Sequence, residues 1–154
     1  MVTRIALTVH QPYATLLVLG VKDIENRGRA LPSTRTGRML WIHAGKTIRP
    51  YEDDRAAWEH LALLGWGVEE IQADAGRILG WVVPWGSHHA DECLHRTGRD
   101  FTRDGRPLPA SEWCSRWAHP DSHHWQVSDG HRIDDPPACR GQQGLWRIPE
   151  EIDT

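Results

Sequence analysis

The chain has 154 residues, which suits one domain of ordinary size and leaves little room for two. Hydrophobic residues make up 39% and charged residues 25%, so neither disorder nor a membrane protein is the first interpretation. The longest apolar runs, such as 78–83, are too short to cross a bilayer, and no basic-then-apolar leader opens the chain. We therefore expect a cytoplasmic protein with no membrane partner.

The formal net charge of −3 conceals an asymmetry along the chain. Residues 1–50 carry eight basic side chains and two acids, whereas residues 51–75 carry seven acids and one arginine. A basic first third is typical of a phosphate-binding face, and a solvated surface is the alternative. Only two of the 18 basic residues are lysines, Lys22 and Lys46, which marks them as positions where a compact ammonium is wanted.

Hydrophobic spacing predicts a short strand, a helix and a second strand in the first 50 residues. Ile5, Leu7 and Val9 alternate with polar or small residues. A helix follows from Pro12 and ends at Gly20, because the apolar residues between them recur at helical spacing. The stretch 21–27 is expected to be extended or looped, and a strand is expected over 38–44.

Beyond residue 50 the pattern predicts one helix and three strands. The helix begins near Pro50 among acidic residues, buries a face that includes Leu64, and stops at Gly65. A covered central strand runs over 76–83 and is closed by Pro84. A loop-rich excursion fills 85–122, with at most a short helix near 112–117. Closing strands are expected at 125–127 and 145–148, with a turn at Asp129-Gly130, so the fold class is α+β, built on a small barrel.

The densest group of functional side chains lies between Leu7 and Arg29. It places His10 and Gln11 at the helix start, and four further polar or charged side chains just after the helix stop, namely Lys22, Glu25, Asn26 and Arg27. The two cations suit phosphate, and the carboxylate and amide suit base edges. A self-satisfied ion-pair cluster is the alternative.

These segments resemble activating signal cointegrator homology (ASCH) domains. LTVHQPYA (7–14) is similar to the family's opening, and GVKDIENR (20–27) to its GxKxxExR pattern. WIHAGK (41–46), ILG (78–80), HWQV (124–127) and CRGQQGLWRIP (139–149) are similar to its later strands and its closing segment, in the expected order. The resemblance touches both ends and the middle of the chain.

The resemblance implies a single ASCH-like domain over 1–154 with a PUA-like fold, a small β-barrel with two or three helices flanking a cleft. The implied role is nucleic-acid binding, chiefly of RNA, with a nucleotide recognised in a basic cleft beside the first helix, and RNA or single-stranded DNA as the partner. Gly20, Lys22, Glu25 and Arg27 would line the cleft, His43 and Lys46 would border it, and Trp125 would either stack on a base or belong to the core. The full candidate set is His10, Gln11, Lys22, Glu25, Asn26, Arg27, His43, Lys46 and Trp125.

An enzymatic role is the second hypothesis. Some small relatives are acetylcytidine amidohydrolases that combine a lysine, a threonine three residues on and a later glutamate, and other relatives are described as ribonucleases. Lys22 fits the lysine, but Glu25 stands where the threonine would be, so the hydroxyl nucleophile is missing. Glu25 would then act as a general base for water beside Lys22.

Histidines and cysteines crowd the excursion, and zinc is the third hypothesis. Their residue types suit zinc, but the spacing is irregular, with no CxxC and no HExxH. We therefore expect no metal and no cofactor, with histidines that titrate near neutrality, and leave zinc open as the alternative. The residues concerned are His88, His89, Cys93, His95, Cys114, His119, His123 and His124, while Cys139 is expected to be structural.

Overall fold

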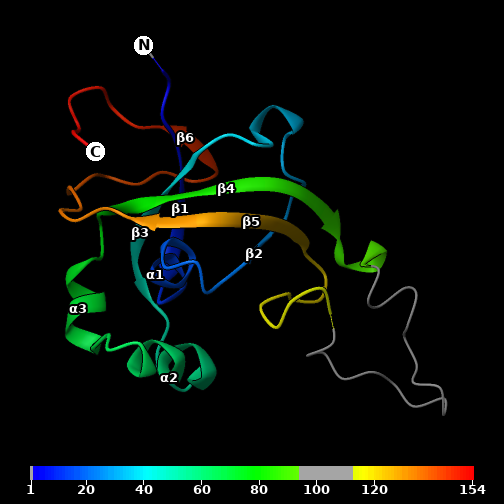
Figure 1. Cartoon of the computed structure of the whole chain (residues 1–154), viewed down its shortest axis with the longest axis horizontal. Helices are drawn as coiled ribbons and strands as arrows, with labels where there is room; N and C mark the ends of the chain where they lie inside the picture. Colours follow the sequence, from blue (N-terminus) through cyan, green and yellow to red (C-terminus); the bar gives the residue numbers. More distant parts are fainter. Residues whose placement is uncertain (1, 94–112) are drawn as a thin grey trace. The chain divides into compact units, whose positions relative to one another are not determined.

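The computed structural model describes residues 2–93 and 113–154 (Figure 1). One six-stranded sheet has the strand order β2-β5-β4-β3-β1-β6, and the described residues also form three α-helices. The α+β prediction is confirmed. The strands are β1 (Ile5–Gln11), β2 (Ile24–Arg27), β3 (Leu40–Ile48), β4 (Ile78–His89), β5 (His123–Arg132) and β6 (Leu145–Arg147), and the helices are α1 (Tyr13–Val18), α2 (Arg55–Leu63) and α3 (Val68–Ala73).

The chain forms two compact units. The first comprises Met1–Lys22, Met39–Val83 and Asp129–Thr154, and the second comprises Asp23–Arg38 and Pro84–Ser128. One domain over 1–154 therefore stays a prediction. In the first unit, Trp41 and Trp146 pack with Ala6, Ile78 and Ile148 in a buried core cluster.

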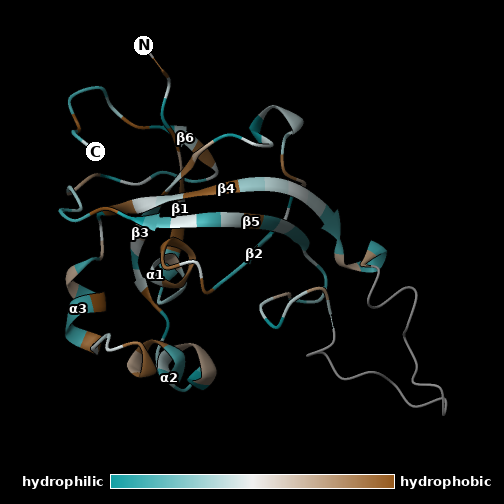
Figure 2. Ribbon diagram, viewed as in Figure 1, coloured by the Kyte–Doolittle hydropathy of each residue, from teal (hydrophilic) through white to brown (hydrophobic). Residues whose placement is uncertain are grey.

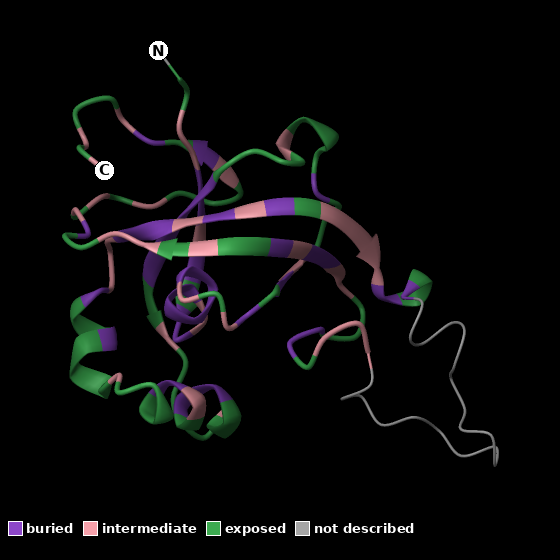
Figure 3. Ribbon diagram, in the orientation of Figure 1, coloured by how far each residue is buried: buried purple, intermediate pink, exposed green. Residues whose placement is uncertain are grey.

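Strands β1 and β3 pair in parallel, which requires a crossover between them, and α1 lies in that crossover. The helix is short because Gly20 follows it with φ of +74°, a left-handed conformation that ends a helix at low cost. All its side chains after Tyr13 are buried, whereas α2 and α3 are largely exposed (Figure 3). The register places Thr8 directly opposite His43.

Strand β4 is longer than the sequence predicts. It continues through Pro84 to His89 and changes along its length from apolar to polar (Figure 2). Pro84 does not end the strand, and its carbonyl accepts a hydrogen bond of 2.7 Å from the Gly37 amide. The expected central position of this strand is correct, since β4 lies between β3 and β5.

The Asp129-Gly130 pair makes no turn, because both residues lie within β5. Asp129 has a positive φ of 53°, so the sequence cue is real but acts inside a strand. A Cβ on Gly130 would meet the Leu17 carbonyl and the Gly20 backbone, so glycine here permits close approach to the end of α1. The pair therefore serves packing instead of chain reversal.

Helix α2 begins later than Pro50, with Asp54 as its N-cap accepting a hydrogen bond from the Ala57 amide at 3.1 Å. Leu64 is 51% exposed, so its expected burial is wrong, and α3 was not predicted. Of the excursion, 85–89 belong to β4 and Ala90–Glu92 form a 3₁₀ helix, η2, while 113–117 form bends and turns. Glu112 and His95 lie outside the described residues. Within 2–93 and 113–154, no helix is long and apolar enough to cross a membrane.

Candidate functional site

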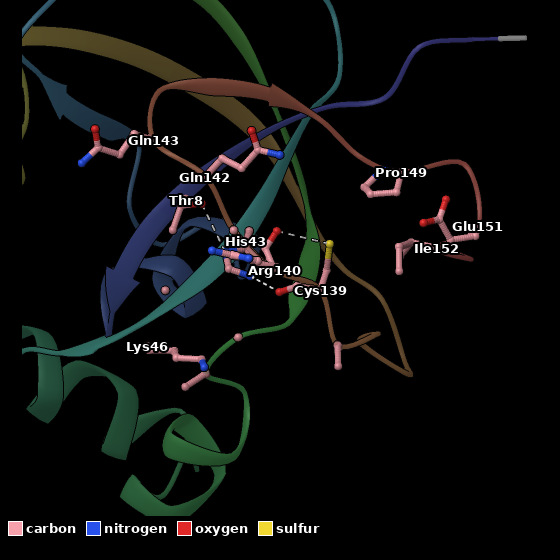
Figure 4. Close-up of a pocket in the computed structure, with 15 residues that line it drawn as sticks. Thr8, His43, Lys46, Cys139, Arg140, Gln142, Gln143, Pro149, Glu151 and Ile152 are labelled. Carbon is pink, nitrogen blue, oxygen red and sulfur yellow. Dashed lines mark hydrogen bonds between the residues drawn. The ribbon is translucent and has the colours of Figure 1, made fainter.

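An open pocket of about 1580 Å³ lies in the first unit (Figure 4). It contains His43 and Lys46, two residues that the sequence assigns to binding. The lining also includes Thr8 from β1 and the loop that precedes β6, with Arg140, Gln142 and Gln143. Two cations and three amide or hydroxyl groups thus share one concave surface, together with a single carboxylate from Glu151.

His43 is fixed at the bottom of this pocket by bonds on both ring nitrogens. Nε2 lies 2.8 Å from the Cys139 carbonyl, which can only accept, so Nε2 carries the proton. Nδ1 therefore accepts from the Thr8 hydroxyl at 3.2 Å, and that oxygen accepts in turn from the Trp146 indole at 3.1 Å. Burial lowers the pKa of His43, partly offset by its backbone hydrogen bonds, so the ring is neutral at pH 7.

Glycine at position 141 allows the loop before β6 to reach this histidine. A Cβ on Gly141 would lie 2.5 Å from His43 Cε1 and 2.8 Å from Thr8 Oγ1, well inside contact distance. The close approach is the reason that residues far apart in the sequence form one pocket wall.

The predicted residues around α1 have separate roles. Gln11 is fully buried, and its amide bonds the Thr15 amide and hydroxyl and the Ile71 carbonyl. His10 is exposed at a register shift between β1 and β3. Lys22 is only 4% exposed, with Nζ 5.6 Å from the centre of the Tyr13 ring, within the range of a cation–π contact. None of these three lines the pocket.

In the second unit, β2 carries three predicted residues and pairs with β5. Glu25 and Arg27 lie on one face, as alternation along a strand requires, with 3.6 Å between Oε1 and Nη1. Asn26 is on the opposite face, donates to the Trp117 carbonyl at 2.7 Å and accepts from the His119 amide at 2.8 Å. Trp125 is paired with Glu25, is 4% exposed, and donates to the Arg29 carbonyl, so its ring has no open face here.

Four of the histidines and cysteines in the second unit also come together: His88, Cys93, Cys114 and His124. Burial lowers the pKa of both imidazoles, and each lowering is reinforced by neighbouring histidines. Burial and the adjacent Cys93 raise the pKa of Cys114 to about 12. In the second unit His89 instead stacks edge-on against His123, with ring centres 4.9 Å apart.

The backbone is similar to solved ASCH structures. The crystal structure of ASCH from Zymomonas mobilis matches with a TM-score of 0.50 and 16% identity, over 96% of this chain and 89% of that one. A point mutant of ZmASCH from the same organism matches with a TM-score of 0.51 and 14% identity, over 96% and 91%. The chain therefore has the ASCH-like α+β fold that its sequence segments predict.

No protein-family model matches the chain, and no curated protein matches it either. The fold comparison thus stands on backbone geometry. Thr8, Arg140, Gln142 and Gln143 are polar pocket residues to which the sequence assigned no binding role. The only signal for the last three was the CRGQQG stretch, which carried the resemblance to the closing segment.

Proposed function

We propose that this protein binds single-stranded RNA and that the first-unit pocket receives part of the strand. The observation that carries the proposal is the placement of His43 and Lys46 in one pocket with Arg140 and two glutamine amides. Such a lining offers cations for the backbone and amides for the bases. Sequence and geometry thus support the same pair of residues independently.

The chemistry of the lining fits a nucleotide. Lys46 and Arg140 suit phosphate oxygens, and the Gln142 and Gln143 side chains have both donors and acceptors for base edges. Pockets for small ligands usually measure about 300–1,000 Å³, so a pocket of about 1580 Å³ suits a stretch of polymer better than a single small molecule. A single strand is favoured because duplex RNA hides its base edges in a narrow major groove.

Glu25 and Arg27 of the second unit are proposed as a second set of contacts, and Lys22 of the first unit as a separate one. Lys22 and Glu25 are 4% and 7% exposed, and charged side chains are rarely so buried unless they are paired or serve a site. Arg27 keeps 29% of its side chain exposed and so remains accessible to a phosphate. Internal pairing of these charges within their own units is the competing explanation, as in the Glu25–Arg27 pair.

Fluorescence anisotropy with a labelled single-stranded RNA tests both sets at about 50 mM and about 200 mM salt. We expect binding that weakens with salt, and a salt slope that falls by about one for each phosphate contact removed. The variants are Lys46→Met, Arg140→Gln, Lys22→Met and Arg27→Gln. Arg147→Gln is the matched control, because Arg147 is exposed on β6 in the first unit but does not line the pocket.

The outcomes separate the alternatives. No binding at low salt would overturn the proposal, and so would an equal loss in all variants including Arg147→Gln. Loss in the Lys46 and Arg140 variants alone assigns the pocket and leaves Lys22 and Arg27 to internal pairing within their own units. Competition with DNA of the same sequence shows which sugar is preferred.

Hydrolysis of a modified nucleoside or of RNA is the second candidate function, favoured by one observation in the pocket. The His43 imidazole lies between two partners. Its Nδ1 is 3.2 Å from the Thr8 hydroxyl, and its Nε2 is 2.8 Å from the Cys139 carbonyl. A hydroxyl, a base and a group that orients the base are what nucleophilic hydrolysis needs. The Thr8 hydroxyl would supply the nucleophile that is missing from the pattern of Lys22 and Glu25.

Turnover assays discriminate the two functions. The protein is incubated with acetylcytidine and with labelled RNA, and products are separated by chromatography. Loss of turnover in Thr8→Val assigns the pocket hydroxyl, whereas loss in Glu25→Gln assigns the pair predicted from sequence. Absence of any product with either substrate rejects the hydrolase and leaves binding.

A further inference from the structure

We propose that His88, Cys93, Cys114 and His124 bind a structural zinc ion in the second unit. One ligand atom from each side chain can be chosen so that all four lie within 4.8 Å of one another. His88 Nε2 is 3.2 Å from His124 Nδ1, and Cys114 Sγ is 3.4 Å from the same nitrogen. Two imidazoles and two thiols are one of the standard donor sets for structural zinc.

The distances match a tetrahedral site. Zinc–sulfur bonds of about 2.3 Å and zinc–nitrogen bonds of about 2.0 Å place neighbouring ligand atoms about 3.3–3.8 Å apart. Two of the separations, 3.2 and 3.4 Å, are close to the lower end of this range, and all four ligand atoms lie within 4.8 Å of one another. Side-chain rotations would bring the more distant ligand atoms into the range.

The orientation of His124 favours coordination. Its Nε2 lies 2.7 Å from the His119 carbonyl, which can only accept, so the proton resides on Nε2. The lone pair of Nδ1 then faces His88 and Cys114. Metal-bound histidines almost always use their second nitrogen in this way, because the outer hydrogen bond fixes the ring and its tautomer.

Asn26 supports the carbonyl that holds His124. Its Oδ1 accepts from the His119 amide at 2.8 Å and from the Ser122 hydroxyl at 3.3 Å, and its Nδ2 donates to the Trp117 carbonyl at 2.7 Å. The loop before β5 is thereby shaped around one amide. A built outer layer of this kind distinguishes the cluster from histidines and cysteines that meet by chance.

The environment fits a structural ion better than a catalytic one. Cys93 and His124 are fully buried, and the Trp113 ring lies edge-on to His124 with centres 5.6 Å apart. Four protein ligands complete a tetrahedron and leave no position for water or substrate. The ion would join the end of β4, the end of η2, the bend at Cys114 and the start of β5.

The sequence offers these four residues among eight zinc candidates but does not single them out, because the adjacency of two strands, and not a short spacing motif, brings them together. His88 and Cys93 flank η2, while Cys114 and His124 flank the loop that Asn26 organises. Neither pair alone has the four ligands of a zinc site, and the adjacency of β4 and β5 brings the two pairs together (Figure 1). The expectation of no metal rested on the missing CxxC and HExxH patterns.

Elemental analysis of the full chain, purified without chelators, tests the proposal. We expect about one zinc per chain, and less than about half an equivalent would overturn it. Cys93→Ser and Cys114→Ser should lose the metal, whereas Cys139→Ser and His89→Asn should keep it. Cys139 belongs to the first unit, and His89 lies beside the cluster without joining it, so these controls match residue type and neighbourhood.

A second measurement protects the test against variants that fail to fold. The wild-type protein is stripped of metal and given Co²⁺, and a tetrahedral site with two thiolates produces intense visible bands and sulfur-to-cobalt charge transfer. Binding releases the thiol protons, so affinity should fall as the pH is lowered. Weak octahedral bands would overturn the proposal, and so would two missing thiols in the denatured, unreduced protein, which would indicate a Cys93–Cys114 disulfide.

Discussion

At the scale of single residues, the pocket depends on the glycine at position 141, which has no side chain to hold the loop away from His43. We expect Gly141→Ala to lower the free energy of unfolding by about 1–3 kcal/mol, because the added Cβ would press on His43 and Thr8. Urea denaturation measures the loss. Gly28→Ala is the control, since a Cβ there meets nothing within 4 Å, and an equal effect at both positions would contradict the explanation.

His43 should contribute a defined part of the pH dependence of stability. Burial lowers its folded-state pKa below the ordinary 6.5, so the unfolded chain takes up more protons at mildly acidic pH. Its contribution is fully present above pH 6.5 and is lost as the pH falls from there through the folded-state value. Urea denaturation between about pH 5 and about pH 8 should show a shallower slope for His43→Gln than for the wild type. Identical slopes would contradict the assignment.

Asn26 is expected to affect metal binding more than RNA binding. Asn26→Ala frees the His119 backbone and thereby the ring of His124. Loss of such a supporting contact typically weakens metal affinity by about 10–100-fold. Competition with a chromophoric chelator measures the change, and Ser87→Ala, which loses one hydrogen bond to the Leu31 amide in the same unit, is the control. Unchanged zinc affinity in Asn26→Ala would contradict the supporting role.

The sequence singles out candidate site residues where chemistry is concentrated along the chain, and misses residues that the fold brings together. Lys22 and Glu25 stand in one charged segment, both are buried, and their role in binding stays a prediction. Thr8 and Gly141 carry no unusual chemistry in the sequence. They matter because a parallel strand register and a close loop bring both to His43.

At the scale of elements, Asp54 links the starts of two helices. Its Oδ1 caps α2, and its Oδ2 accepts from the Tyr13 hydroxyl of α1 at 2.7 Å. We expect Asp54→Ala to lower the free energy of unfolding by about 1–3 kcal/mol, since it removes a cap and leaves a half-buried phenol unsatisfied. Asp53→Ala should change it by less than about 0.5 kcal/mol, because that carboxylate makes an exposed 4.0 Å pair with Arg49.

A double-mutant cycle with Tyr13→Phe completes this test. If the phenol and the carboxylate interact, the double variant should be more stable than the sum of the single losses predicts. Strict additivity would show that Asp54 acts only as a helix cap. Urea denaturation of the four proteins supplies the comparison.

The type of an element, helix or strand, was predicted correctly from the sequence more often than its boundaries. Alternation identified β1, and the Pro12 and Gly20 signals bounded α1, because these cues act locally. The strand end predicted at Pro84 and the turn predicted at Asp129-Gly130 were wrong. Each lies inside a long strand and is contacted there by another part of its own unit. Helix α3 was missed because only Ile71 of its six residues is buried, which leaves almost no hydrophobic period to detect.

At the scale of the whole molecule, the charge asymmetry has a structural counterpart. The acidic residues of 51–75 lie mainly on α2 and α3 and the segments around them, which are largely exposed. The pocket takes its cations from Lys46 and Arg140. The net charge of −3 therefore conceals a basic pocket and acidic helices within one unit.

Removal of zinc should loosen the second unit and spare the first. The proposed ligands all belong to the second unit, whereas the core of Ala6, Trp41, Ile78, Trp146 and Ile148 belongs wholly to the first. Local stability follows local contacts, so loss of the ion should raise amide exchange only where it joins the chain.

Hydrogen–deuterium exchange of the metal-loaded and chelator-treated protein measures this. Peptides that cover 84–93 and 113–128 should take up deuterium faster after chelation, while those that cover β1 and β3 should not change. Cys139→Ser, treated in the same way, should reproduce the wild-type pattern, because Cys139 is outside the cluster. A uniform rise across both units would mean that they unfold together, and no change in either would mean that the ion does not stabilise the fold.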